Sequence, residues 1–143
     1  MDLTIRDAQA GDAEAIGGLL GELGYPADPA AVQARLERLV IVGDKVMVAA
    51  LAGEVVGIAH LHVSPTIEHE RPAAKLGALV VSETHRGQGI GRALVEAAEG
   101  EARLRGSGVF FLTTAERRDD AHGFYESLGL EQTGRRYGRT LNQ

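Results

Sequence analysis

The stretch that decides the fold is Leu76-Gly77-Ala78-Leu79-Val80-Val81-Ser82, followed three residues later by Arg86-Gly87-Gln88-Gly89-Ile90-Gly91-Arg92. The first part is an aliphatic run typical of a central strand, and apolar spacing from Ile90 onward predicts a helix to about Arg105. A glycine-rich turn between them lets backbone N–H groups close on an anion, and the helix N-terminus adds partial positive charge. Because Arg86 and Arg92 flank the turn, we expect it to hold a diphosphate.

Working outward, the chain alternates helical and strand periods. Before the central strand we expect a strand at Leu3–Ile5, a helix capped by Asp12, a helix capped by Asp28 with Pro29 as its first residue, and a hairpin of Lys45–Leu51 and Glu54–Val63 followed by a polar loop, Ser64–Ala74. After the helix that follows the glycine turn we expect a strand at Val109–Thr114, a helix at Asp120–Leu128, and one or two strands within Leu130–Leu141. The central strand-helix-strand unit predicts a parallel pair with a right-handed crossover. We therefore expect one domain over residues 1–143, of the α/β (α+β) class, with a mixed sheet of six to seven strands and about four helices.

Composition narrows the function classes. The formal net charge is −5, from 15 Lys+Arg against 20 Asp+Glu; nucleic-acid binders usually carry a basic face, so no nucleic-acid partner is expected. Cysteine is absent, which excludes disulfides, thiolate nucleophiles and Cys-ligated zinc. The N-terminal residues lack a targeting pattern, and the apolar runs are far shorter than the ~18 residues that span a bilayer. We expect a cytoplasmic protein with no membrane partner.

The glycine turn has three competing interpretations. The dinucleotide fingerprint needs G-x-G-x-x-G and a P-loop needs Gly-Lys-Ser/Thr, and this turn matches neither. The remaining pattern, Arg-x-x-Gly-x-Gly, resembles the pyrophosphate loop of the GNAT superfamily of N-acetyltransferases; a merely flexible linker is the bland alternative. A second match is Asp120–Leu130, which includes Phe124-Tyr125 and resembles the family's late helix, with Leu130 in place of the usual Phe. Two motifs in the family's order make coincidence a poor explanation.

The resemblance implies a cofactor and a set of contacts. Acetyl-CoA would lie between the strand Leu76–Ser82 and the parallel strand Val109–Thr114. The strand residues Leu79, Val80 and Val81 would border the pantetheine arm, with backbone groups of Leu79 and Val81 pairing with it. The pyrophosphate would be held by the loop residues Arg86, Gly87, Gln88, Gly89, Gly91 and Arg92. No metal is predicted.

Acetyl transfer to an amine needs a proton acceptor for the amine and a proton donor for the departing thiolate. By resemblance Tyr125 is the general acid, since a phenol keeps its proton at neutral pH and can donate it; simple packing beside Phe124 is the alternative. The family's usual glutamate base falls on Ala78. Candidate replacements are Glu68, His69, Glu70 and Glu83, or His60 and His62 acting through water, since these two histidines share one strand face. A His-carboxylate metal site among the residues of this group is a weaker interpretation.

The acceptor is expected to be a primary amine of a small molecule, acetylated by direct transfer in a ternary complex. The Gly-Glu-Val-Val-Gly segment Gly53–Gly57, the Leu61-His62 that follows it, and Asp120-Ala121-His122 before Phe124-Tyr125 resemble one type within the superfamily. This is the aminoalkylphosphonate N-acetyltransferase type, which implies that Arg135, Arg136 and Arg139 pair with a phosphonate. Polyamines, aminoglycosides and protein amines stay open. So do a non-catalytic acyl-CoA-binding sensor and a domain that binds another nucleotide diphosphate. By the same resemblance a homodimer is possible, paired through edge strands near Leu130–Leu141.

Overall fold

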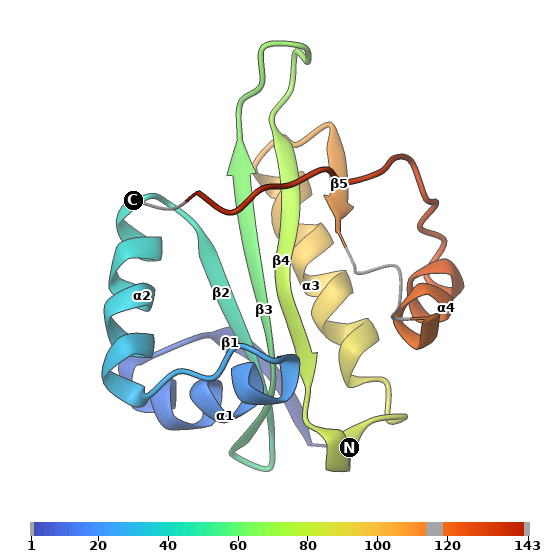
Figure 1. The fold of residues 1–143 in the computed structure, drawn as a ribbon. Coiled ribbons are helices and arrows are strands. Elements are labelled where there is room, and N and C mark those ends of the chain that lie inside the picture. Colours follow the sequence, from blue (N-terminus) through green and yellow to red (C-terminus); the bar gives the residue numbers. More distant parts are fainter. Residues whose placement is uncertain (1, 114–118, 142–143) are drawn as a thin grey trace. The chain divides into compact units, whose positions relative to one another are not determined.

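The computed structural model describes residues 2–113 and 119–141, and the chain divides into two compact units, Met1–Phe111 and Leu112–Gln143. The first unit is built on a sheet whose strands lie in sequence order (Figure 1). These strands are β1 (Leu3–Asp7), β2 (Lys45–Leu51), β3 (Glu54–Ser64), β4 (Ala73–Val81) and β5 (Val109–Leu112). The four strands β1 to β4 form an antiparallel meander, and the β2–β3 hairpin turns at Ala52-Gly53 as predicted.

The connection from β4 to β5 passes through α3 (Ile90–Leu104). In Figure 1 the arrows of β4 and β5 point the same way, so the predicted parallel pair with a helical crossover is confirmed. The strand β4 begins at Ala73, within the predicted polar loop. Ala73 and Ala74 are buried there, but two alanines carry little strand signal in a sequence.

Helices cover both faces of this sheet. On one face α1 (Ala13–Leu23) and α2 (Pro29–Ile41) pack over the strands β2, β3 and β4. The cluster formed there consists of Ala13, Ile16, Leu19, Val32, Val48, Ile58 and Val80. On the other face lies α3, whose fully buried Leu94 sits over Gly57: a Cβ built on Gly57 would be 3.0 Å from Leu94 Cδ1. Successive residues of β3 therefore point alternately toward α1 and α2 on one face and toward α3 on the other.

The helix starts show one confirmed cap and one correction. Asp28 accepts a hydrogen bond from the Ala31 N–H at 2.8 Å, and α2 begins at Pro29, both as predicted. Asp12 does precede α1, but its carboxylate makes no cap bond to that helix. It accepts from the Gln9 N–H at 2.8 Å and from the Arg6 guanidinium at 2.8 and 3.0 Å. The nearby arginine of β1 is the stronger partner for a carboxylate.

The second unit contains α4 (Asp119–Ser127), close to the predicted helix Asp120–Leu128. The strands predicted within Leu130–Leu141 are wrong: the chain there is irregular. That segment has only Leu130, Tyr137 and Leu141 as large apolar residues, without period-two alternation, so it has no face to bury. Across the described residues the sheet thus has five strands rather than six to seven, with four α-helices, and no edge strand is formed there for a dimer.

Candidate active site

The glycine turn joins β4 to α3, and a Cβ built on its residues Gly87 or Gly89 would meet no atom within 4 Å. A short 3-10 turn, Glu83–His85, follows the strand, and α3 then begins at Ile90. Gly87 and Gly89 have φ of 79° and 82°, the left-handed region that L side chains rarely adopt. Gly89 is the N-cap of α3 and makes no side-chain cap bond. The amides of the first helical turn have no partner within their own helix, so they point to whatever occupies the turn.

Several contacts hold this turn in place. The carboxylate of Glu22, on α1, accepts the Glu83 N–H at 2.8 Å and lies 4.0 Å from the Arg86 guanidinium. Arg86 also donates from Nε to the Val81 carbonyl at 3.3 Å. Ile90 is buried and fixes the first turn of α3 to the core. The contact of Glu22 with this turn was not predicted, because nothing in the sequence around an exposed helix glutamate indicates that it binds a residue 61 positions away.

Among the flanking arginines, Arg86 keeps its side chain 56% exposed despite these contacts, and Arg92 is exposed on the first turn of α3. Both cations therefore remain available to an anion at the turn. The structure thus brings together the predicted loop residues, Arg86 to Arg92, as one segment at a helix N-terminus, exposed except at the buried Ile90 and the half-buried Gly91. Such a segment is suited to a phosphate or diphosphate group.

The end of β4 presents an edge beside the turn. β5 has only four residues and begins beside the start of β4, where the Gly108 N–H donates to the Pro72 carbonyl at 2.9 Å. The last residues of the nine-residue strand β4 therefore extend beyond the end of β5. Val80 is buried toward α1, and Leu79 and Val81 are half-buried. Among the residues that the structure describes, no strand pairs with this end of β4 on the side of β5, and an unpaired strand edge offers main-chain groups to an extended amide-bearing ligand.

A β-bulge interrupts the pairing of β3 and β4. Ala59 pairs with Leu79 and Leu61 pairs with Leu76, so Gly77 and Ala78 together face the single residue His60. A Cβ built on Gly77 would lie 2.8 Å from His60 Nδ1, which means that the imidazole covers this backbone. Bulges of this kind are common beside active sites because they redirect the strand.

The two histidines of β3 share one carboxylate. Asp44 lies 2.7 Å from His60 Nε2 and 2.6 Å from His62 Nδ1, and its side chain is only 5% exposed. Burial raises the pKa of Asp44, but the hydrogen bonds from His62 and His60 and their charges outweigh that effect and hold it below its usual value. The predicted shared face of His60 and His62 is confirmed. Asp44 was missed, because a lone aspartate before a strand looks like a turn residue.

The other candidate bases are scattered. Glu68 and His69 form an exposed pair 3.7 Å apart in the loop between β3 and β4, with Glu70 beside them. Glu83 is exposed at the start of the turn. In residues 2–113 and 119–141, no group of three His, Cys, Asp or Glu side chains is arranged to hold a metal ion.

The second unit carries the other motif. Tyr125 and Phe124 lie on α4, half-buried, with ring centroids 5.4 Å apart and an interplanar angle of 57°. Arg136, Gly138, Arg139 and Thr140 line a cavity of about 370 Å³. Two of the three arginines predicted to pair with a phosphonate therefore share one concave surface.

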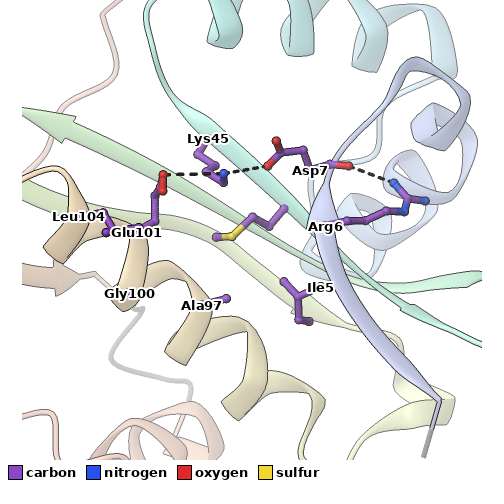
Figure 2. Close-up of a pocket in the computed structure, with 9 residues that line it drawn as sticks. Ile5, Arg6, Asp7, Lys45, Ala97, Gly100, Glu101 and Leu104 are labelled. Atoms are coloured by element: carbon purple, nitrogen blue, oxygen red, sulfur yellow. Dashed lines mark hydrogen bonds and ion pairs between the residues drawn. The ribbon is translucent and has the colours of Figure 1, made fainter.

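A larger cavity, of about 540 Å³, lies at the other half of α3 (Figure 2). Its lining consists of Ile5, Arg6, Asp7, Lys45, Met47, Ala97, Gly100, Glu101 and Leu104. Lys45 Nζ bridges it, 3.1 Å from Asp7 and 3.8 Å from Glu101, as the dashed lines in Figure 2 mark. None of the predicted cofactor residues lines this cavity, so volume alone does not locate the site.

No helix within the described part of the chain is long and apolar enough to cross a membrane.

Comparison with known proteins places these features in a family. Aminoalkylphosphonate N-acetyltransferase of Salmonella typhimurium is 39% identical over 89 residues, which is 62% of this chain and 58%, little more than half, of that relative. A transcriptional regulator from Bacillus halodurans has a similar structure, with a TM-score of 0.89, 27% identity and coverage of 97% of this chain and 99% of that one. An acetyltransferase from Trypanosoma brucei has a TM-score of 0.85 at 26% identity, covering 98% and 100% of the two chains. The profile of the acetyltransferase (GNAT) family matches residues 19–130, and the chain belongs to that family.

Proposed function

We propose that this chain, as a single domain over residues 1–143, transfers the acetyl group of acetyl-CoA to a primary amine of a small molecule. The observation that carries the proposal is the turn Arg86–Arg92: two left-handed glycines, unpaired first-turn amides and two exposed arginines directly after a strand. A diphosphate is the chemical group that this arrangement suits best. Family membership favours CoA as the molecule that carries it.

The proposed cofactor contacts follow the chain from strand to helix. Amides of Gln88, Gly89, Gly91 and Arg92 hold the pyrophosphate, and Arg86 and Gly87 shape the turn around it. The pantetheine arm lies along Leu79, Val80 and Val81, where β4 extends beyond β5. Its amides would use main-chain groups of that edge as a further strand would.

In the proposed reaction the amine attacks the thioester carbonyl directly in a ternary complex, without an acetyl-enzyme. The absence of cysteine from the sequence removes the most nucleophilic side chain for a covalent route. Tyr125 is proposed to protonate the departing thiolate, a role supported by the Phe124-Tyr125 motif on α4. Replacing Tyr125 with Phe keeps the ring and removes the proton donor, which makes it the matched test.

The first acceptors to test are aminoalkylphosphonates. The Salmonella typhimurium relative bears that activity in its name, and Arg136 and Arg139 line one concave surface in this chain. Guanidinium groups pair with phosphonate oxygens through charge-assisted hydrogen bonds. Arg135 lies next to them in the sequence and belongs to the same proposal.

A screen of amines monitored by release of the CoA thiol tests the function. The panel contains aminomethylphosphonate, spermidine, kanamycin and a lysine-bearing peptide, each with acetyl-CoA. We expect turnover with at least one small amine. For Tyr125→Phe we expect kcat to fall by about 10- to 100-fold, which is at or below the smaller effects seen when a general acid is removed. Turnover of the peptide alone would replace the small-molecule acceptor by a protein amine.

A second candidate is a cytoplasmic acyl-CoA-binding sensor without turnover, which Ala78 favours because the family's usual glutamate is missing there. The similarity to a structure described as a transcriptional regulator points the same way. A sensor would be stabilised by acetyl-CoA in a thermal-shift assay and release no thiol with any amine. Failure of acetyl-CoA to stabilise the protein at all contradicts both candidates.

A further inference from the structure

His60 lies on the face of the sheet where a replacement for the missing glutamate would be useful. Ile58, two residues earlier on β3, belongs to the cluster under α1 and α2, so His60 lies on that same face. Ala78 packs against this cluster too. Ala78, where the family resemblance places the usual glutamate, and the imidazole of His60 therefore face the same side of the sheet, next to the bulge at Gly77 and Ala78.

Asp44 fixes the chemical state of this imidazole. Its lowered pKa keeps it ionised at neutral pH, and a carboxylate can only accept, so the His60 Nε2 that lies 2.7 Å away carries the proton. In the neutral form of the ring the lone pair is therefore on the other nitrogen, Nδ1. The backbone N–H of Asp44 donates to the Leu39 carbonyl at 2.9 Å, which anchors the aspartate to the end of α2.

The second ring nitrogen of His60, Nδ1, is not fully buried. In the described part of the chain, His60 Nδ1 has no hydrogen-bond partner, and the only buried side-chain polar atom without one is Ser107 Oγ. Nδ1 is therefore accessible as well as unpaired. Because Gly77 has no side chain, this nitrogen sits directly over the backbone of the bulge.

The proposed cofactor path ends near this point. With the pyrophosphate at the turn and the arm along Val81 and Leu79, the thioester lies toward the start of β4. Gly77 is four residues before Val81, about 13 Å along a strand. The acyl group would therefore lie beside the bulge that His60 covers.

We propose that His60, positioned by Asp44, accepts the proton of the acceptor ammonium; this rests on the proposed acetyltransferase function. His60 Nδ1 takes one proton from the ammonium, and the neutral nitrogen then attacks the thioester carbon. The C–N bond forms and the C–S bond breaks as the adduct loses the second amine proton. The thiolate takes a proton to become the CoA thiol, so one proton is released to solvent for each acetyl group transferred.

His62 provides a matched control. It binds the same carboxylate and lies on the same strand face, but its side chain is 47% exposed against 26% for His60. Across the sheet it pairs with Lys75 of β4 rather than with the bulge. Three charged or titratable side chains lie around His60. They are Asp44 from the α2–β2 connection, His62 from β3, and Lys75 from β4, which pairs with His62. His62→Gln therefore removes the other imidazole that binds Asp44 and leaves the bulge at Gly77 and Ala78 unchanged.

The experiment compares His60→Gln, Asp44→Asn and His62→Gln with two kinds of acceptor. For the amine that the wild type acetylates best in the panel, we expect His60→Gln to lower kcat/KM by about 100-fold or more, the size of a lost general base. Asp44→Asn and His62→Gln should each lower it less than His60→Gln does, because both keep the imidazole of His60. With trifluoroethylamine, which is mostly unprotonated at neutral pH, the deficit of His60→Gln should largely disappear. Acetyl-CoA affinity should be unchanged in all three variants.

The outcomes separate the two proposals. If the wild type releases thiol with some amine but His60→Gln acts like His62→Gln, the base assignment is wrong and the acetyltransferase function stands. A deficit of His60→Gln that is equal for both kinds of acceptor indicates a structural role and also overturns it. If no amine is acetylated by the wild type, the proposed function has failed as well.

A measurement without any acceptor tests the dyad directly. Imidazole nitrogen NMR of the wild type should show that the neutral form of the His60 ring carries its proton on Nε2, and Asp44→Asn should lose this preference. A neutral form with its proton on Nδ1 contradicts the proposal.

Discussion

Replacing Gly89 with alanine tests whether the turn conformation is needed to bind the cofactor. Gly89 has φ of 82° and ψ of 6° as N-cap of α3, and a Cβ built there meets no atom within 4 Å. The cost of Gly89→Ala is therefore backbone strain without a clash, about 1–2 kcal/mol for an L residue in the left-handed region. This strain has to appear either in the stability of the protein or in its affinity for acetyl-CoA.

The two possibilities are distinguishable. If the turn keeps its conformation, urea unfolding should show a loss of about 1–2 kcal/mol with unchanged acetyl-CoA affinity. If the turn relaxes, stability is kept, the amides of Gln88 and Gly89 move, and calorimetric titration should show binding weakened by roughly 5- to 30-fold, the equivalent of that free energy. Intermediate behaviour should divide the same total between the two measurements.

Gly100→Ala is the matched control within the same helix. Gly100 lies in the interior of α3, a Cβ there also meets nothing within 4 Å, and its φ is ordinary. This change should raise stability by about 0.5–1 kcal/mol through helix propensity and leave acetyl-CoA binding unchanged. Wild-type stability together with wild-type affinity in Gly89→Ala would refute the reasoning about the turn.

Four further changes have definite expected outcomes. Arg92→Ala should weaken acetyl-CoA binding and make it less sensitive to salt in calorimetric titrations, because one phosphate contact is lost. Leu94→Ala should lower the free energy of unfolding by about 2–5 kcal/mol, since Leu94 is fully buried between α3 and the sheet at Gly57. Asp28→Ala should cost about 0.5–2 kcal/mol in the same assay by removing the α2 cap. Asp12 has its pKa lowered by the hydrogen bond from Arg6, so its contribution is present above about pH 4 and lost as pH falls through the lower folded value. Asp12→Asn should therefore be less stable than the wild type at neutral pH, and the gap should close as the pH falls through the lowered pKa of the folded Asp12.

The sequence predicted the parts of the fold that depend on local patterns. The hairpin around Ala52-Gly53, the cap at Asp28 and the strand-turn-helix unit at the glycine turn all follow from residue type and spacing, and the structure confirms them. The strands expected within Leu130–Leu141 were wrong. Scattered apolar residues among glycines and arginines give no alternating face, and only a partner strand could have compensated.

The site was predictable to the extent that it is local. The turn residues are contiguous in the sequence, so their motif was visible without a structure. Glu22 and Asp44 were not, because each acts on residues far along the chain: Glu22 on Glu83 and Arg86, Asp44 on the histidines of β3. The bulge opposite His60 was also hidden, since Gly77 in an apolar strand indicates a bulge only as one of several options.

Amide NMR spectra recorded during a titration with acetyl-CoA test the central claim most directly, because they report on each backbone N–H separately. We predict that the amides of Gln88, Gly89, Gly91 and Arg92 shift most, together with Leu79 and Val81, and that all saturate with one dissociation constant. Acetyl-pantetheine, which lacks the pyrophosphate, should move only the β4 amides. Unchanged turn amides, with shifts gathered instead around the cavity of Lys45 and Glu101, would contradict the account.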